Sequence, residues 1–474
     1  MDVYGPLVRH ILWPAWERGI RRRPILPILR DLERAESASL DELLARQRSA
    51  LATLLRHAYD NVPFYRRRFE EAGLVPGDIG GPEDLARLPA LTRQQARAAQ
   101  DSRCSRTPPV PAIRKTTGGT TGEPLVIRYD RDSEHWRQAI KLRGFSWAGY
   151  RVGDRVLHYW GEATRPDKRL SSRFKRAADQ ALKREQTIDC TPRGEAHLAA
   201  VVRAIRRGRP RVLSCYAQAG ADLARHVVRT RARTWGDIRV ICGAERLLPD
   251  DRNALAQAFG PHIFETYGCR ETMLIASECE AHDGLHISME NLVVELVITE
   301  DGRERAAAPG ELGEVVLTDL HNLGMPFIRY KTGDLAVAKA SVACACGRSH
   351  QRLASVEGRE TDTLRDRDGN RVGGMVFNLI VSPIADAVDA FQVVQHPDRS
   401  ITFRLIPTPR FDDDAVAHVR RSFDRYLPGI PVTIARVREI PRTRAGKRRL
   451  VVVEEPEPGV NPRAVESLPS ARAQ

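Results

Sequence analysis

The stretch richest in glycine and threonine runs from Lys115 to Pro124 and reads KTTGGTTGEP. Glycine admits backbone angles that other residues avoid, and clustered amide N–H groups beside hydroxyls form a concave site that suits a phosphate anion. A P-loop is excluded, because no Gly-Lys-Ser/Thr sequence closes the stretch. Taken alone, the loop is equally compatible with a flexible hairpin. The residues expected to cradle phosphate are Thr117, Gly118, Gly119, Thr120, Thr121 and Gly122.

Further polar motifs follow at points where the chain is expected to leave a strand or to enter a smaller domain. Ligands of α/β proteins gather at the carboxyl ends of parallel strands, so motifs at these positions are candidate binding elements. In chain order they are Gly243-Ala244-Glu245, Tyr267-Gly268-Cys269-Arg270-Glu271-Thr272, Tyr330-Lys331-Thr332-Gly333-Asp334, Gly358-Arg359-Glu360-Thr361-Asp362 and Pro441-Arg442-Thr443-Arg444-Ala445-Gly446-Lys447.

The elements that must position these motifs are readable from hydrophobic spacing. Residues 40–73 predict two helices that meet at Pro63, and residues 210–267 alternate strands with helices, which indicates a parallel sheet covered by helices. After Met289 the pattern predicts antiparallel strands at 291–299, 314–319 and 326–330. A helix from about 375 to 388 and two strand–helix alternations complete the chain up to Val453.

We therefore predict an α/β protein with a large and a small domain. The large N-terminal domain, residues 1–358, combines parallel αβ sheets with an antiparallel β-barrel-like subdomain. The small α+β domain, residues 359–455, carries Lys447, and residues 456–474 form a flexible tail rich in Pro, Glu, Ser and Ala.

Composition limits the class of protein. With 474 residues, 42% of them hydrophobic, the chain can bury a large core, which excludes disorder for most of it. The net charge is 75 − 61 = +14, but arginine is scattered among acidic residues, which disfavours nucleic acid as the partner. Trp13 and Trp16 lie in a segment that either packs on the core or lies on a membrane surface. No apolar run is long enough for a transmembrane segment and no signal-peptide pattern is present, so we expect a cytoplasmic protein with reduced cysteines.

In this order and at these separations, the six motifs resemble those of the adenylate-forming superfamily, which includes acyl-CoA synthetases. Within it the chain is similar to the phenylacetate-CoA ligase and CapK-like branch, through Asn61-Val62-Pro63-Phe64-Tyr65, the cysteines at 344–346 and the helices that precede residue 73. The resemblance spans residues 40–453. It implies ATP-dependent activation of a carboxylic acid to an acyl-adenylate with release of pyrophosphate, followed by transfer to a thiol, usually that of coenzyme A.

The resemblance also implies roles for individual residues. Lys447 is the catalytic lysine that bridges the acyl oxygen and the nucleotide 5′ oxygen, and Glu271 holds Mg²⁺ against the phosphates. Asp334 accepts both ribose hydroxyls, and Arg359 contacts ribose or phosphate beside the hinge of the small domain. The adenine site comprises Gly243, Ala244, Glu245, Tyr267 and Gly268.

Three departures from the family pattern accompany these roles. Arg270 stands where a threonine or serine is usual, the hinge position is Thr361, and no lysine follows Glu123-Pro124-Leu125. Neighbours of the nucleotide motifs indicate an acyl pocket that mixes aromatic and small side chains and suits an aryl or medium-length acid. Its residues are Trp160, Tyr216, Ala217 and Gln218.

A second constellation has the chemistry of a metal site. Cys344 and Cys346, with Cys279 and His282 about 60 residues upstream, would supply a tetrahedral set of sulfur and nitrogen ligands for a structural Zn²⁺. His286 or His350 is an alternative to His282, and free buried cysteines are the alternative to a metal.

Several functions remain open at this point. Acyl transfer to an amine or to a carrier-protein thiol would leave the same adenylation motifs, as would a protein that binds nucleotide without turnover. The net charge of +14 keeps a basic nucleic-acid-binding protein as a remote alternative. A homodimer is compatible with the sequence.

Overall fold

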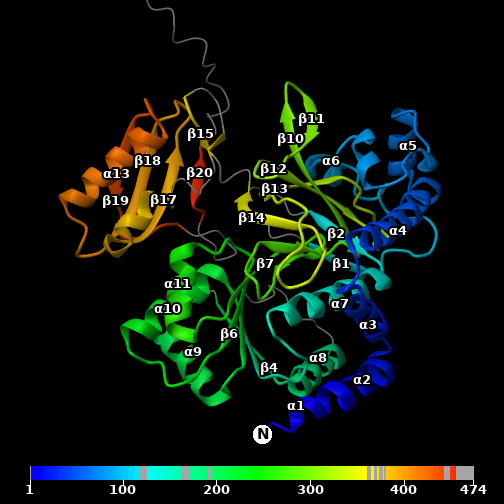
Figure 1. Ribbon diagram of the computed structural model, residues 1–474, viewed down its shortest axis with the longest axis horizontal. Coiled ribbons are helices and arrows are strands. Elements are labelled where there is room, and N and C mark those ends of the chain that lie inside the picture. Colours follow the sequence, from blue (N-terminus) through cyan, green and yellow to red (C-terminus); the bar gives the residue numbers. More distant parts are fainter. Residues whose placement is uncertain are drawn as a thin grey trace, which may run out of the picture. The chain divides into compact units, whose positions relative to one another are not determined.

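The computed structural model describes residues 2–116, 125–161, 170–190, 195–359, 364–367, 371–372, 377, 380–441 and 449–454. The chain divides into two compact units, and the division falls between Gly358 and Arg359. Each unit has its own sheet and its own hydrophobic core, so the two are described separately (Figure 1).

Helices precede the large sheet. A continuous helical segment comprises α1 (Tyr4–Leu7), η1 (Val8–Leu12), α2 (Trp13–Ala15) and η2 (Trp16–Arg21), and α3 (Ile25–Ala35) follows it. The two helices predicted around Pro63 are α4 (Leu40–Asn61) and α5 (Pro63–Glu71). Proline at the first position of α5 starts that helix because its missing N–H is not needed there. Short helices η3 (Pro76–Asp78), η4 (Pro82–Arg87) and α6 (Arg93–Ala98) lead to the hairpin of β1 (Ile113–Thr116) and β2 (Val126–Tyr129).

One half of the large sheet is parallel, in agreement with the spacing of its apolar runs. The strands lie in the order β4 (Glu185–Asp189), β3 (Val156–Trp160), β5 (Val212–Tyr216), β6 (Arg239–Gly243) and β7 (Ile263–Cys269). Helices α7 (Arg131–Trp147), α8 (Leu170–Lys183), α9 (Glu195–Gly208), α10 (Ala217–Arg229) and α11 (Pro249–Phe259) connect or cover these strands. The strands share a core with α9, α10 and α11, and this core contains Leu157, Leu213, Val240 and Leu255.

The other half of the same sheet contains the antiparallel pairings of β7 with β8 (Met273–Glu278) and of β8 with β9 (Leu285–Ile287). It continues with β14 (Arg352–Arg359), β13 (Tyr330–Ala338), β12 (Leu312–Asp319), β10 (Leu292–Glu300) and β11 (Arg303–Ala306). The twelve-stranded sheet is open, with β4 and β11 at its two edges. The barrel-like closure predicted for the antiparallel part is therefore wrong for the described residues, because these strands extend the parallel sheet instead of closing on each other.

The strand predicted at 326–330 is displaced. Only Tyr330 of that stretch belongs to a strand, the first residue of β13. Pro326 has no N–H for a ladder, and its carbonyl accepts the Tyr65 hydroxyl at 3.0 Å. The Ile328 N–H then donates to the Tyr65 oxygen at 3.0 Å, so this backbone is satisfied by a buried tyrosine.

The small unit is an α+β layer. Its four-stranded sheet has the order β19 (Val432–Arg436), β18 (Ile401–Pro407), β17 (Val388–Gln395) and β20 (Val451–Val453), and α13 (Asp413–Tyr426) packs on it through Val419 and Phe423. Strands β15 (Leu364–Arg365) and β16 (Arg371–Val372) and the short helix η6 (Ser382–Ala387) complete the described part. Among the helices of the described ranges, none is both long and apolar enough to cross a membrane.

Candidate active site

The predicted nucleotide and acyl residues of the large unit gather at one edge of its sheet. β3 ends at Trp160, β5 at Tyr216 and β6 at Gly243, and Tyr267 lies near the end of β7. These strands are parallel and neighbouring, so their carboxyl ends meet at the same edge. The structure therefore brings together residues that are up to 107 positions apart in the sequence, from Trp160 to Tyr267.

The turn after β6 is closely packed against its neighbours at Gly243. A Cβ atom on Gly243 would lie 2.8 Å from Oγ1 of Thr266 and 3.3 Å from the ring of Trp160. Ala244 has a positive φ of 65°, a conformation that costs energy for a residue with a side chain. The carboxylate of Glu245 accepts the Gln218 N–H at 3.2 Å and so joins this turn to the start of α10. Glycine is required at 243, because any side chain there would meet Thr266 and Trp160.

Tyr267 and Asp334 are in direct contact. The Tyr267 hydroxyl donates to Oδ2 of Asp334 at 2.7 Å, and the Asp334 N–H donates to Oγ1 of Thr332 at 3.0 Å. Burial raises the pKa of Tyr267 well above its usual value, and the Asp334 carboxylate raises it further. Tyr267 therefore remains a neutral hydrogen-bond donor that fixes one oxygen of Asp334.

Glu271 lies in the turn between β7 and β8 and is buried, with 6% of its surface exposed. Its Oε1 accepts the Tyr330 hydroxyl at 3.2 Å and lies 3.7 Å from a guanidinium nitrogen of Arg93. The tight turn depends on Gly268, because a Cβ there would lie 2.1 Å from the Met273 carbonyl oxygen. The carboxylate is thus held by a phenol and flanked by a cation.

Arg137 supports Glu271 from behind, and sequence reasoning missed it. Its guanidinium donates to the Glu271 carbonyl oxygen, binds Asp319 Oδ2 at 2.6 Å and lies over the Tyr129 ring at 4.6 Å. It is 2% exposed. Nothing in the local pattern distinguishes this arginine from the others of α7, because its partners come from distant strands.

The predicted acyl residues are partly brought together. Trp160 and Tyr216 form an edge-to-face pair with ring centroids 4.5 Å apart, and Gly161 leaves room beside the Tyr216 hydroxyl. Gln218 is the second residue of α10, the helix that begins directly after Tyr216. Ala217, the first residue of α10, is fully buried in the core behind β5. An aromatic wall therefore stands at this edge, and Ala217 supports it from the core.

Glu265 is a second residue that sequence reasoning missed. It lies on β7 beneath the Gly243 turn and accepts the Leu247 N–H at 3.3 Å. Burial raises its pKa to about 7, and the neighbouring Glu278 carboxylate contributes in the same direction. A charged residue within a strand of a parallel sheet was the available signal.

The cysteine cluster forms at the opposite end of β8. Ligand atoms of Cys279, His286, Cys344 and Cys346 all lie within 4.8 Å of one another, with Cys279 and Cys344 sulfurs 3.8 Å apart and Cys346 Sγ 3.4 Å from His286 Nε2. His286 and both Cys279 and Cys344 are buried.

The histidine of this cluster is His286, not His282. His282 lies in a turn with φ 51°, its Nδ1 is 2.9 Å from Glu278 Oε1, and its ring stacks on Phe264. His286 lies on β9, where pairing with β8 and β14 carries it toward the cysteines. Burial, with His350 beside the ring, lowers the pKa of His286 to about 4.

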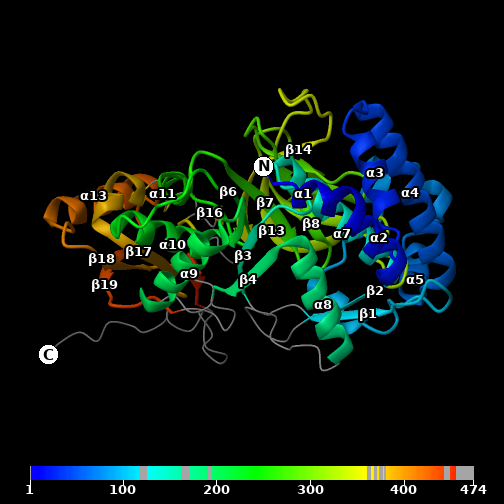
Figure 2. The same cartoon turned by 90° about the horizontal axis from the view of Figure 1, so that it is seen from below.

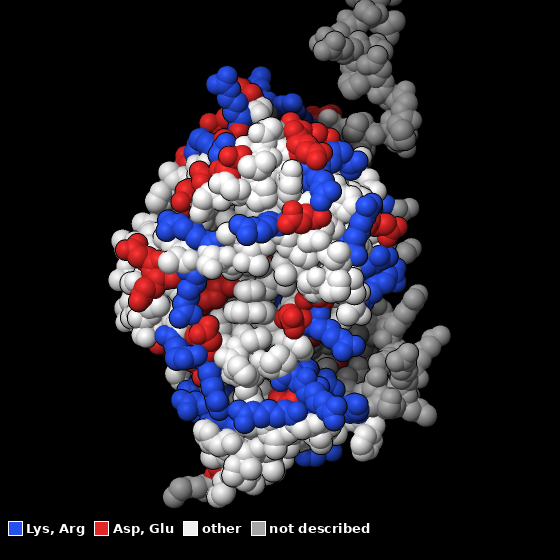
Figure 3. All heavy atoms as spheres, turned by 90° about the vertical axis from the view of Figure 1, so that its right-hand side faces the viewer, with Lys and Arg blue, Asp and Glu red and all other residues white. Residues whose placement is uncertain are grey.

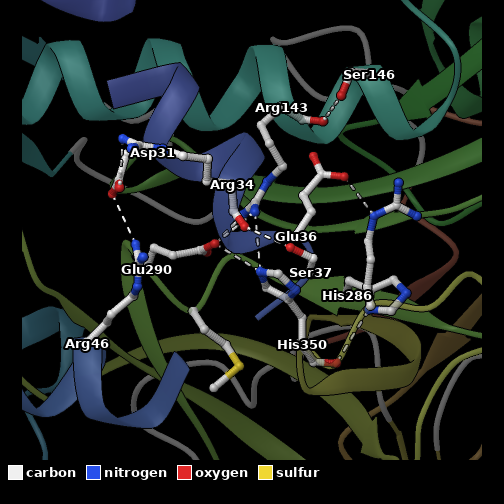
Figure 4. A network of polar contacts seen from close by, with 12 residues as sticks. Asp31, Arg34, Glu36, Ser37, Arg46, Arg143, Ser146, His286, Glu290 and His350 are labelled. Carbon is white, nitrogen blue, oxygen red and sulfur yellow. Dashed lines mark hydrogen bonds and ion pairs between the residues drawn. The ribbon is translucent and has the colours of Figure 1, made fainter. Parts of the chain in front are cut away.

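A buried ion network borders the cluster. The Arg143 guanidinium binds both oxygens of Glu290 at 2.9 and 3.0 Å, and His350 Nε2 lies 2.9 Å from Glu290 Oε1 (Figure 4). Arg143 and Arg348 lie over the Trp147 ring, at 4.4 and 5.0 Å from its centroid. This network ties α7 to the strands that carry the cluster.

Other predicted site residues lie outside the described parts of the chain. These are Thr117, Gly118, Gly119, Thr120, Thr121 and Gly122 of the Thr/Gly loop, Thr361, and Lys447. Arg359 is described as the last residue of β14, at the border of the two units, but its side chain is not.

Solved structures share the fold of this chain. The chain resembles a 2-hydroxyisobutyryl-CoA ligase solved in the postadenylation state, with a TM-score of 0.71, 17% identity and coverage of 89% of this chain and 92% of that one. It also resembles ATP-bound MatB from Rhodopseudomonas palustris, with a TM-score of 0.51, 17% identity and coverage of 73% and 68%. These two likenesses establish the fold of the chain.

Relatives in sequence show the family of this chain, although no family model matches it. The phenylacetate-coenzyme A ligase of Escherichia coli K12 is 30% identical over 350 residues, which cover 72% of this chain and 76% of that protein. The enzyme of the same name from Thermus thermophilus is 26% identical over 447 residues, 88% of this chain and 98% of that protein. The chain belongs to the phenylacetate-coenzyme A ligase family, which confirms the predicted enzyme class, an AMP-forming acyl-CoA ligase.

Proposed function

We propose that the chain joins an aryl or medium-length carboxylic acid to coenzyme A in two steps at the edge where β3, β5, β6 and β7 end. In the first step a carboxylate oxygen attacks the α-phosphorus of ATP, the bond to the pyrophosphate oxygen breaks, and an acyl-adenylate forms. In the second step the thiol sulfur attacks the acyl carbon and AMP leaves. The observation that carries this proposal is the placement of Glu271 and the Tyr267–Asp334 pair at that edge.

The nucleotide is bound by groups with distinct tasks in this proposal. The adenine would rest on the backbone of the turn at Gly243, Ala244 and Glu245 and on the ring of Tyr267. One oxygen of Asp334 is held by Tyr267, which orients the carboxylate so that it accepts the ribose hydroxyls. This arrangement fixes the α-phosphate relative to the acid before the reaction begins.

Glu271 fits the ligand set of a magnesium ion. It offers a buried carboxylate oxygen, the donor type that this hard cation prefers, and Tyr330 limits its rotation. When bound, the ion neutralises phosphate charge and favours departure of pyrophosphate. Arg137 holds the backbone of Glu271 and so positions the carboxylate, and Arg93 adds positive charge on the side of Oε1.

Lys447 and the Thr/Gly loop supply the remaining charge in the proposal. The loop amides would bind the β- and γ-phosphates, and the Lys447 ammonium would stabilise the charge that develops between the carboxylate and the 5′ oxygen. One site serves two reactions, so the small unit would turn between the first reaction and the second. The hinge would lie just after Arg359, at Thr361. Arg359 would contact ribose or phosphate.

The aromatic pair at the edge supports the substrate class. Trp160 and Tyr216 present apolar ring surface beside the small Gly161, which suits a planar or unbranched acyl group. Arg270 stands where the family resemblance leads us to expect a threonine or serine, and its charge would attract the carboxylate of the acid toward the α-phosphate.

The test is ATP–pyrophosphate exchange with a panel of aryl, arylacetic and aliphatic acids, followed by addition of coenzyme A. We expect exchange with one class of acid, then stoichiometric AMP and thioester after the thiol is added. Lys447→Ala should reduce exchange about a thousandfold, whereas Lys175→Ala, an exposed lysine of α8, should leave it unchanged. Transfer of the acyl group to amines but not to coenzyme A would contradict coenzyme A as the acceptor. Equal exchange rates in Lys447→Ala and Lys175→Ala would contradict the role of Lys447.

We also propose that Cys279, His286, Cys344 and Cys346 hold a structural zinc ion. Three thiol sulfurs and one imidazole nitrogen within 4.8 Å of one another match the number and type of ligands that zinc prefers. The four residues come from the chain after β8, from β9 and from the stretch before β14, so the metal would join segments that are far apart in the sequence. It would have no part in the reaction, because all its positions are taken by protein ligands.

A further inference from the structure

The helical segment from Val3 to Arg23 exposes apolar side chains on one face although it also packs on the core. Val8, Trp13 and Glu17 are buried against the large unit, and the Trp16 indole donates to Asp179 of α8 at 3.1 Å. The tryptophans therefore pack on the protein. The opposite face carries Val3, Leu7 and Ile11 at a spacing of four residues, and these are 76%, 40% and 59% exposed.

Exposed large apolar side chains are concentrated in this region. Among the described residues, twelve large hydrophobic side chains are exposed, and six of them belong to this segment or to α8. The two elements lie side by side, because the Tyr4 hydroxyl donates to the Leu182 carbonyl and Lys183 lies over the Trp13 ring. Figures 1 and 2 show α1, α2 and α8 at the same end of the large unit. The six residues are Val3, Tyr4, Leu7, Ile11, Ile20 and Phe174.

Three arginines follow the apolar residues along the same segment. Arg18 and Arg21 lie in the π-helical turn Trp16–Arg21, and Arg22, with φ 51°, ends it. Arg18 and Arg22 are exposed, and Arg21 is half-buried. For Arg18, Arg21 and Arg22 no acidic partner occurs within the parts of the chain that the structure describes. Figure 3 shows Lys and Arg side chains in a band near the lower end of this side of the molecule, next to uncharged surface.

The acidic residues of the segment are already occupied. Asp2 is bound by Arg184 at 2.7 Å, and Glu17 is fully buried against Arg23 at 2.5 Å and the Trp13 indole. A second copy of the chain would therefore bring no free carboxylate of this segment to the arginines. Exposed apolar side chains followed by arginines instead suit a bilayer that contains anionic lipids. The apolar side chains would contact acyl chains, and the arginines would contact lipid phosphates.

We propose that the segment Val3–Arg23 binds reversibly to the surface of an anionic bilayer. Val3, Leu7 and Ile11 enter the boundary between headgroups and acyl chains, and Arg18, Arg21 and Arg22 contact the lipid phosphates. The segment lies in the plane of the surface and does not span it, because its other face remains packed on the large unit.

The test is sedimentation of the full-length protein with vesicles of phosphatidylcholine alone or of three parts phosphatidylcholine and one part phosphatidylserine. Binding is expected only to the anionic vesicles and should decrease in 0.5 M salt. Two variants, Leu7→Ser/Ile11→Ser and Arg18→Gln/Arg21→Gln/Arg22→Gln, should each bind about tenfold or more weakly.

Matched controls separate this surface from general charge and apolarity. Val342→Ser replaces an apolar side chain that is 63% exposed, close to the 59% of Ile11. Arg56→Gln/Arg67→Gln/Arg421→Gln removes three exposed arginines elsewhere. Both variants should bind as the unsubstituted protein does. Unchanged thermal unfolding and unchanged pyrophosphate exchange in solution would show that all four variants are folded. Three results would overturn the proposal: no vesicle binding, equal binding to both lipid compositions, or loss of binding in the control variants. Capture of an acidic protein without vesicle binding would also overturn it.

Discussion

The two ends of β8 show two different uses of the same strand. At one end, Glu271 and the neighbouring Tyr267–Asp334 pair hold polar groups at the sheet edge, where the nucleotide is proposed to bind. At the other end, Cys279 meets His286, Cys344 and Cys346 in a buried cluster bordered by the Arg143–Glu290–His350 network. In our proposal the first set binds the substrates and the second holds a structural zinc ion. Function and stability should therefore separate experimentally along this one strand.

The largest effect at the cysteine end should follow loss of the proposed zinc. Cys344→Ser/Cys346→Ser leaves two ligands, so the purified protein should contain less than one zinc per chain by elemental analysis. At a free zinc concentration a thousandfold above the Kd of the unsubstituted protein, the free energy of unfolding of the double variant should be lower by about 4 kcal/mol. Cys104→Ser, at a cysteine outside the cluster, is the control. Full metal content in the double variant would contradict the ligand set.

The ion network beside the cluster should give the next effect. Glu290→Gln leaves the Arg143 guanidinium buried without a counter-charge, which should lower the free energy of unfolding by about 3 kcal/mol. Exposed Glu300→Gln, which also loses an arginine partner, should change stability little. Denaturant unfolding measures both, and equal losses would show that burial of the pair is not what matters.

At the nucleotide end, Glu265 should make stability depend on pH. Burial raises its folded pKa to about 7 from the usual 4.5, so the folded state binds the proton more tightly and stability falls as pH rises through that interval. In Glu265→Gln this fall should be smaller by about 2 kcal/mol between pH 5 and pH 8. Parallel stability curves for the two proteins would contradict the raised pKa.

The smallest effect should come from the phenol that orients Asp334. Tyr267→Phe removes one hydrogen bond and keeps the ring, so the Kd for ATP should rise about fivefold, equivalent to about 1 kcal/mol. Isothermal titration measures this change, and the stability of the variant should stay within about 1 kcal/mol of the unsubstituted protein. A larger loss of stability than of binding would place Tyr267 in the core and not in the site.

The sequence was sufficient for the elements whose cause is local. Apolar runs predicted β5, β6 and β7 together with α10 and α11, and polar motifs at strand ends predicted that Tyr267 and Glu271 lie at the sheet edge. The open sheet was not predictable, because the spacing of apolar residues within β13 does not determine which strands it pairs with. His286 was ranked below His282 for the same reason, since strand register and not distance along the chain selects the histidine. Arg137 gave no signal, because its partners Asp319 and Glu271 are over 130 residues away.

The separation of the two ends of β8 is tested most directly by acid-dependent ATP–pyrophosphate exchange in Glu271→Gln and Cys344→Ser, each normalised to the folded fraction. The account predicts that Glu271→Gln loses exchange by a factor of about 100 to 1000 with normal stability, because charge at the phosphates is no longer balanced. Cys344→Ser should keep the exchange rate per folded molecule while it unfolds more readily. Full exchange in Glu271→Gln, or loss of exchange in folded Cys344→Ser, would contradict this separation of chemistry from structural support.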